Sequence, residues 1–158
     1  MSEPLTINPR IVEGLYCEAL VLADEVRSAF TMPEAANESG LDEDLVRVAM
    51  SCEALKTTTR MMHCIAWLLN HRAYCMGELS EFQLMRYGRL PSDTQSSDAE
   101  QLALLEPATR RLVRTTERFH ARLKRLDKTW RQRDPNMPSA IASLRARVER
   151  RMGQEARP

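Results

Sequence analysis

The stretch from Leu41 to Gly77 constrains the fold most, because apolar or small residues recur along it at alternating steps of three and four. This spacing predicts one continuous helix of about 35 residues, on the order of 50 Å long. Acidic residues at 42–44 suit the first turn of a helix, and Gly77 suits its end. The first row consists of Leu45, Val48, Cys52, Leu55, Thr59, Met62, Ala66, Leu69, Ala73 and Met76.

A second row lies on the opposite face of the same predicted helix. A surface helix keeps one face polar, so a helix with two apolar faces is expected to be covered on both. We assign one face to the chain's own core and the face of Met61, Cys64 and Leu68 to a second copy of the chain, as a homodimer. The alternative is that a fourth helical segment of the same chain covers this face. The second row is Met50, Ala54, Thr57, Met61, Cys64, Leu68, His71 and Cys75, and the predicted dimer interface is Met50, Ala54, Met61, Cys64, Leu68 and Cys75.

Two further long helices with the same period flank the central one. The first is predicted from about Asn8, a good N-cap followed by Pro9, to about Phe30, and the other from Pro107 to about Arg133. Only 5% of residues are aromatic and five are glycine, which favours an all-α fold. The apolar rows are Val12, Leu15, Ala19, Leu22, Val26 and Ala29 in the first, and Thr109, Leu112, Thr116, Phe119, Leu123, Leu126 and Trp130 in the other.

Short elements connect these helices. Ser80 with Gln83 predicts a capping box for a short helix to about Tyr87, and Ser97 with Glu100 predicts another before Pro107. The loops at 31–40 and 92–97 are polar. We therefore predict an all-α fold: a flexible lead-in at residues 1–9, an antiparallel three-helix bundle with a long central helix at residues 10–133, and a basic, disordered C-terminal tail at residues 134–158.

Charge is distributed unevenly along the chain. Residues 1–54 carry 3 basic and 11 acidic side chains, whereas residues 110–158 carry 15 basic and 5 acidic ones. Basic residues on the outer side of the last long helix are either a solvated face or a surface for partners. We rank nucleic acid below a protein partner, because no aromatic residues interleave with the arginines and no compact helix-turn-helix is evident. The predicted partner-binding residues are Arg110, Arg111, Arg114, Arg118 and Arg125.

Signatures of catalysis are missing from the sequence. There is no glycine-rich phosphate loop, HExxH, CxxC or GxSxG motif, and Glu106, Glu117 and Asp127 are not paired as general acid and base. We expect no enzyme activity, no cofactor and no metal. A redox or metal sensor built on Cys64 and its neighbours His71 and Cys75 is a third hypothesis, but four zinc ligands are not apparent.

The location of the protein is also constrained. The longest uncharged run in the central helix, residues 61–71, is too short to cross a bilayer, and the N-terminus does not resemble a signal peptide. The four cysteines fit reduced thiols, as in a cytosolic protein. We therefore expect a soluble cytoplasmic protein that does not act at a membrane.

Residues 51–77, SCEALKTTTRMMHCIAWLLNHRAYCMG, together with a pattern near the end of the last long helix, resemble the DUF1465 family of alphaproteobacterial proteins, specifically its RcdA-like members. The resemblance covers roughly residues 10–130 and leaves the tail unmatched. The resemblance rests on the order and spacing of the matching residues, since none of them forms a catalytic signature. The residues that carry it are Thr58, Thr59, Arg60, Ala66, Trp67, Leu68, Leu69, Arg72, Gly77, Glu78 and Leu79, then Arg122, Leu123, Arg125, Leu126 and Asp127.

The resemblance implies a dimeric three-helix bundle with a flexible C-terminal tail that works as an adaptor for the ClpXP protease. The partners it implies are the AAA+ unfoldase ClpX, a response-regulator-like priming factor, and protein cargo that includes cell-cycle transcription regulators. Such an adaptor has no catalytic activity of its own.

Overall fold

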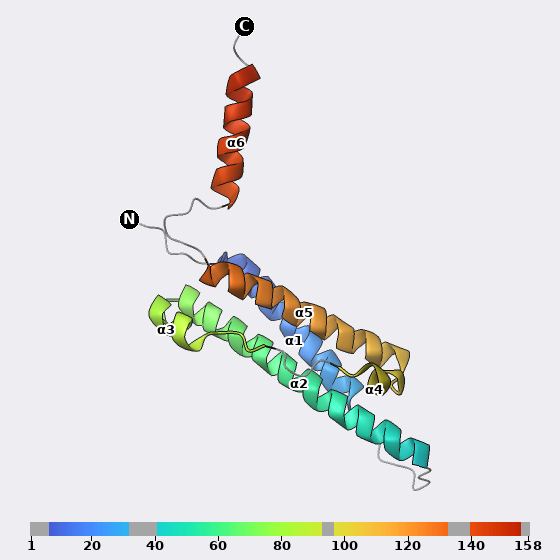
Figure 1. Ribbon diagram of the computed structural model, residues 1–158. Helices are drawn as coiled ribbons and strands as arrows, with labels where there is room; N and C mark the ends of the chain where they lie inside the picture. Colours follow the sequence, from blue (N-terminus) through green and yellow to red (C-terminus); the bar gives the residue numbers. More distant parts are fainter. Residues whose placement is uncertain (1–6, 32–40, 93–96, 133–139, 156–158) are drawn as a thin grey trace.

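The structure is a computed structural model that describes residues 7–31, 41–92, 97–132 and 140–155. These residues form helices and no strands, so the predicted all-α class is confirmed for the described part of the chain. Most of the predicted lead-in, the loop at 32–40, residues 93–96 and the start of the predicted tail lie outside the described residues. The helices are α1 (Pro9–Ala29), α2 (Leu41–Cys75), α3 (Glu81–Tyr87), α4 (Ala99–Ala103), α5 (Pro107–Arg131) and α6 (Ala140–Glu155) (Figure 1).

The ends of α1 and α2 follow from their capping residues. The side chain of Asn8 accepts a hydrogen bond of 2.9 Å from the backbone N–H of Arg10, and Pro9 begins α1. At the end of α2, Gly77 has a φ of +78°, and the N–H of Glu78 donates to the carbonyl of Ala73 at 2.9 Å. This is a Schellman motif, which needs a left-handed residue after the helix. The predicted ends of both helices are confirmed.

Of the two predicted capping boxes, one is confirmed. Ser80 and Gln83 exchange both hydrogen bonds at the start of α3. The predicted box of Ser97 is wrong, because Asp98 caps α4 by accepting from the N–H of Glu100. The Ser97 hydroxyl instead donates to the buried carboxylate of Glu53 at 2.8 Å.

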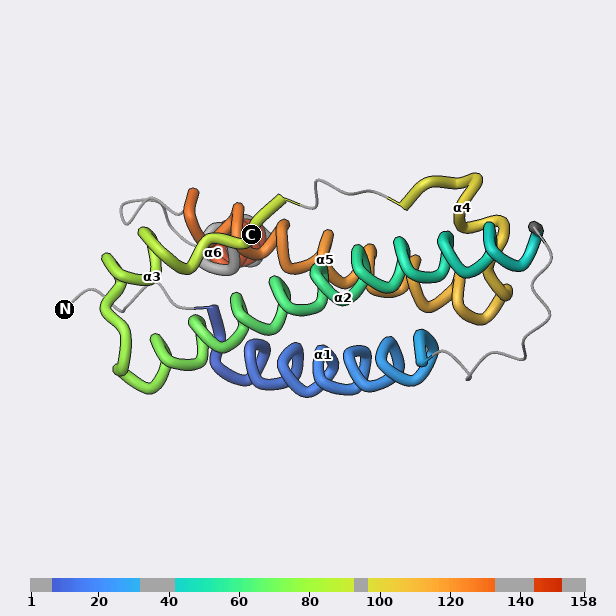
Figure 2. The backbone as a smooth tube through the Cα atoms, turned by 90° about the horizontal axis from the view of Figure 1, so that it is seen from below, coloured from blue at the N-terminus to red at the C-terminus, as the bar shows by residue number. Residues whose placement is uncertain are grey.

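The three long helices α1, α2 and α5 pack against one another, but they do not all alternate in direction. Successive residues of α2 meet successive residues of α5: Arg60 bonds Thr116, and Trp67 bonds Asp127. Helices α2 and α5 are therefore parallel, while α1 is antiparallel to both (Figures 1 and 2). The segment 76–106, which contains α3 and α4, brings the chain back along the bundle. Because the chain returns before α5 begins, α5 starts at the same end of the bundle as α2.

The second row of α2, rather than the first, faces the core. Met61, Cys64 and Leu68 are buried and pack against α1 and α5 residues such as Leu22 and Leu123. The prediction that these three side chains pair two subunits is wrong, because they are enclosed within one chain. Met50, Ala54 and Cys75, the other predicted interface residues, are half-buried on the same side. Helices α1 and α5, rather than a fourth helical segment, cover the face of Met61, Cys64 and Leu68.

The C-terminal segment contains helix α6, where we expected a disordered tail. No described element lies beside α6 in Figure 1, and it packs closely against none of the other helices. The α5 helix that precedes it ends beside the C-terminal end of α2 and the N-terminal end of α1. The tail is therefore helical at Ala140–Glu155 without contributing to the core.

Candidate interaction surfaces

The first row of α2 is an exposed apolar surface. It lies opposite the buried second row, which packs on α1 and α5, and its large side chains are between 44% and 68% exposed. Two interleaved sets repeat every seven residues, as in the a and d positions of a coiled coil. The a set, Leu45, Cys52, Thr59, Ala66 and Ala73, is mostly small, and the d set, Val48, Leu55, Met62, Leu69 and Met76, is large.

A buried polar layer holds α2 against α5. The guanidinium of Arg60 donates to Thr116 Oγ1 at 3.0 Å, and Trp67 Nε1 donates to Asp127 Oδ1 at 2.9 Å. Asp127 also accepts from Arg131 Nε at 3.0 Å. Buried polar groups are stable when their hydrogen bonds are satisfied. Three residues that carry the family resemblance, Arg60, Trp67 and Asp127, therefore fix the packing of α2 on α5.

His71 is enclosed by aromatic rings at the end of this layer. Its ring centroid lies 4.0 Å from that of Trp67 and 5.3 Å from that of Trp130. Burial lowers the pKa of His71 from 6.5 to about 4; the Asp127 carboxylate opposes this shift and the Arg131 guanidinium adds to it. The imidazole is thus neutral at pH 7.

The predicted sensor residues do not form a ligand cluster. Cys64 is buried in the core, while Cys75 is half-buried and burial raises the pKa of its thiol. Among the described residues, no three His, Cys, Asp or Glu side chains gather closely enough to hold a metal ion. His71 is better explained as part of the aromatic packing.

The basic residues of α5 fall on two different faces. Arg111, Arg114, Arg118 and Arg125 are exposed on the outermost side of the helix, whereas the predicted partner-binding residue Arg110 is half-buried. Arg118 and Arg125 border a shallow hollow between α5 and α1. Lys124 and Lys128 point to another side, toward the segment 89–92. The basic residues of α5 therefore do not form one continuous surface.

A groove of about 630 Å³ separates the segment 89–92 from the C-terminal half of α5. Arg89, Lys124, Lys128 and Arg131 line it, together with Ser92. Sequence periodicity did not reveal this groove, because Arg89 lies 35 residues before Lys124 and only the return of the chain along the bundle brings the two together. We call it the cationic groove.

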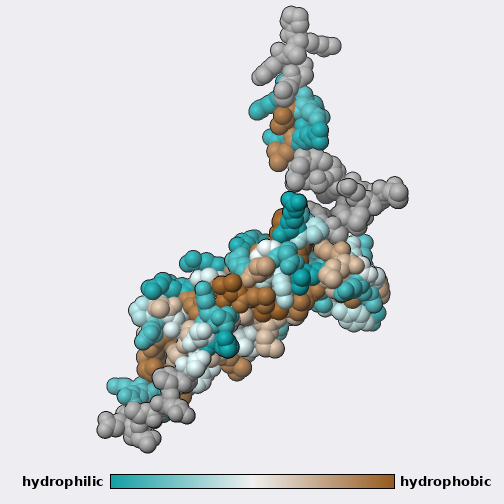
Figure 3. Space-filling view, turned by 180° about the vertical axis from the view of Figure 1, so that it is seen from behind, coloured by the Kyte–Doolittle hydropathy of each residue, from teal (hydrophilic) through white to brown (hydrophobic). Residues whose placement is uncertain are grey.

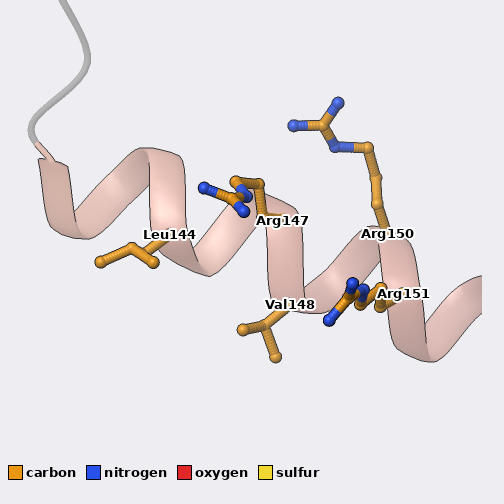
Figure 4. Close-up of a pocket in the computed structure, with 5 residues that line it drawn as sticks. All are labelled: Leu144, Arg147, Val148, Arg150 and Arg151. Carbon is orange, nitrogen blue, oxygen red and sulfur yellow. The ribbon is translucent and has the colours of Figure 1, made fainter.

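Helix α6 has an apolar side and a basic side. Leu144 and Val148 point to one side of the helix and Arg150 to the other (Figure 4). Both apolar residues are exposed, and they form a short brown strip between polar residues in Figure 3. Arg145 pairs with Glu149 one turn later at 3.2 Å. An exposed amphipathic helix of this kind has an unfilled contact face.

None of the helices in the described ranges is both long enough and apolar enough to span a lipid bilayer. Even α2, the longest of them, is interrupted by charged residues such as Arg60 and Arg72.

Comparison with known proteins gives one family match. The sequence profile of a family described as protein of unknown function, DUF1465, matches residues 4–152. This range includes most of the C-terminal segment, so the expectation that the tail lies outside the family pattern is wrong. No curated protein and no solved structure shows significant similarity. Because the match spans nearly the whole sequence, the chain belongs to the DUF1465 family.

Proposed function

We propose that this chain is a homodimeric adaptor without catalytic activity, which helps to deliver regulatory proteins to the ClpXP protease, as its resemblance to RcdA-like proteins implies. The observation that carries the proposal is the exposed first row of α2. Contiguous apolar surface of this extent on a monomer marks a protein contact site. The exposed arginines of α5 supply a second, polar surface for weaker partners.

The shape of the first row favours pairing with a second α2 in the antiparallel direction. In an antiparallel coiled coil an a residue of one helix packs beside a d residue of the other, whereas in a parallel pair like positions meet. Small a residues such as Ala66 and large d residues such as Met62 therefore fill the antiparallel interface evenly. The row extends from residue 45 to residue 76, about 47 Å along the helix. This proposal moves the dimer interface to the face opposite Leu68.

The dimer is tested by placing a charge in the row. Leu55→Glu and Met62→Glu should each convert a dimer to a monomer in sedimentation equilibrium, because a carboxylate would be buried between two apolar helices. Val21→Glu on α1 is the matched control, since Val21 is similarly exposed but lies outside the row. Far-UV circular dichroism should show unchanged helix content. A monomeric wild-type chain, or a dimer that persists in both row variants, would refute the interface.

Delivery is tested with purified ClpX, the peptidase, the priming factor and a labelled candidate cargo. We expect the chain to accelerate cargo degradation, and Arg114→Glu/Arg118→Glu to reduce the acceleration while leaving the dimer intact. Absence of acceleration with every cell-cycle regulator tested, while the chain remains dimeric, would reject the adaptor role and leave the dimer standing.

A nucleic-acid-associated regulatory role is the second candidate, because four arginines share the outermost face of α5. The two aromatic residues of that helix, Phe119 and Trp130, are buried and therefore cannot stack on bases. An affinity for DNA that falls steeply as salt is raised would favour this candidate.

A further inference from the structure

The cationic groove has two walls. One wall is the non-helical segment 89–92. The other is formed by Lys124 and Lys128 of α5 and by Gln132, the residue that caps its C-terminal end. Lys124 Nζ lies 3.4 Å from Ser92 Oγ, so the walls approach one another at that point. A concave site holds a ligand from two sides and excludes more water than a flat patch does.

Positive charge in the groove exceeds what its own carboxylate can neutralise. Arg89, Lys124, Lys128 and Arg131 contribute four cations, while Asp127 contributes one carboxylate that is already bonded to Trp67 and Arg131. Arg131 is paired with Asp127 and donates from Nη1 to the Met85 carbonyl at 2.8 Å, so Arg89, Lys124 and Lys128 supply the remaining positive charge. The groove therefore holds a surplus of positive charge, which favours an anionic ligand.

The spacing of the lysines indicates the form of that ligand. Lys124 and Lys128 are one helical turn apart, about 6 Å along the axis. In an extended peptide, side chains at alternate positions lie on one side and are about 6.7 Å apart. Acidic side chains at alternate positions would therefore meet successive cations of α5, with the remaining side chains directed toward Leu90 and Pro91 or toward solvent.

We infer that the cationic groove binds an extended acidic peptide segment of a partner protein, with carboxylates at alternate positions. Lys124 and Lys128 bind successive carboxylates, and Arg89 faces them from the opposite wall. This binding requires neither the dimer nor the protease, so it stands or falls separately from the proposed function.

The test uses the full chain and a fluorescein-labelled peptide of alternating Glu and Gly, measured by fluorescence anisotropy. Lys124→Glu/Lys128→Glu should weaken binding by at least about tenfold, because two attractions become repulsions. The matched control, Arg147→Glu/Arg151→Glu, has the same spacing on α6 and the same change in charge, but it lies outside the groove. It should change the affinity by about twofold or less. Circular dichroism checks that both variants keep their helices.

A second measurement locates the peptide without any substitution. Carbodiimide should join the peptide carboxylates to Lys124 or Lys128 of the wild-type chain, as read by mass spectrometry, and a Gln-Gly peptide should give neither binding nor cross-links. Equal loss of affinity in both variants would show that net charge alone binds the peptide and would overturn the inference. Tight binding of a single-stranded oligonucleotide or inorganic phosphate, with no binding of the acidic peptide, would overturn it as well.

Discussion

Replacement of His71 by phenylalanine should remove most of one pH-dependent component of stability. His71 is 1% exposed and is enclosed by Trp67 and Trp130, so an aromatic ring of similar size is the most conservative change available. The folded-state pKa of His71 is lowered by burial from 6.5 to about 4. In the unfolded chain the ring is exposed to water and titrates near 6.5.

The direction of the effect follows from which state binds the proton. Above pH 6.5 the ring is neutral in both states, so its stabilising contribution is fully present. As the pH falls from 6.5 toward 4, the unfolded chain takes up a proton that the folded chain does not, and stability is lost. A difference of about 2.5 pKa units corresponds to at most about 3.4 kcal/mol, and to about 2.4 kcal/mol between pH 7 and pH 4.5. The nearest charged groups on α5, Asp127 and Arg131, are included in the lowered pKa.

Urea unfolding followed by circular dichroism, at fixed protein concentration and a series of pH values, measures this contribution. Carboxylates also titrate in this range, so the informative quantity is the difference between the unfolding free energies of wild type and His71→Phe at each pH. We expect this difference to shift by about 2.4 kcal/mol in favour of the variant between pH 7 and pH 4.5. Parallel pH curves for the two proteins would refute the assigned environment of His71. An NMR titration that placed the His71 pKa near 6.5 in the folded chain would refute it as well.

Three further substitutions test the packing. Leu68→Ala should cost about 2–5 kcal/mol of unfolding free energy in urea titrations, because Leu68 is fully enclosed in the core; a loss below about 1 kcal/mol would contradict this. Gly77→Ala should cost about 1 kcal/mol through backbone strain alone, since a Cβ there meets nothing within 4 Å, and an unchanged thermal midpoint would argue against the left-handed cap. Ser97→Ala should cost about 1–3 kcal/mol by removing a donor from the buried Glu53 carboxylate, and an unchanged urea midpoint would contradict this.

Local signals predicted the helices well because each depends on a few adjacent residues. Asn8 with Pro9, Ser80 with Gln83, and Gly77 each specify one helix end through a hydrogen bond or a backbone angle that does not depend on the rest of the fold. Ser97 misled the prediction for a physical reason. Its hydroxyl could cap α4 or bond Glu53, and only the packing of the segment before α4 on α2 decides between the two.

Periodicity did not predict which face of α2 packs against the core. The two rows of α2 have the same spacing, so a helical wheel does not show which of them contacts α1 and α5. Trp67 offered a partial signal, because this large side chain lies nearer to the second row than to the first. The polar residues beside the second row, Glu53 and Arg60, made that row look like a surface face, because their hydrogen-bond partners Ser97 and Thr116 are distant in sequence.

Because the second row of α2 lies in the core, a substitution at Leu68 cannot test dimerisation. The side chain of Leu68 lies in the core of one chain, so Leu68→Glu would unfold that chain rather than separate two subunits. Loss of the dimer in such a variant would then be uninformative. Substitutions at Leu55 and Met62 can test dimerisation, because both side chains are exposed and other residues form the core. The parallel α2 and α5 helices, held by Arg60, Trp67 and Asp127, leave that outer face free for a second protein.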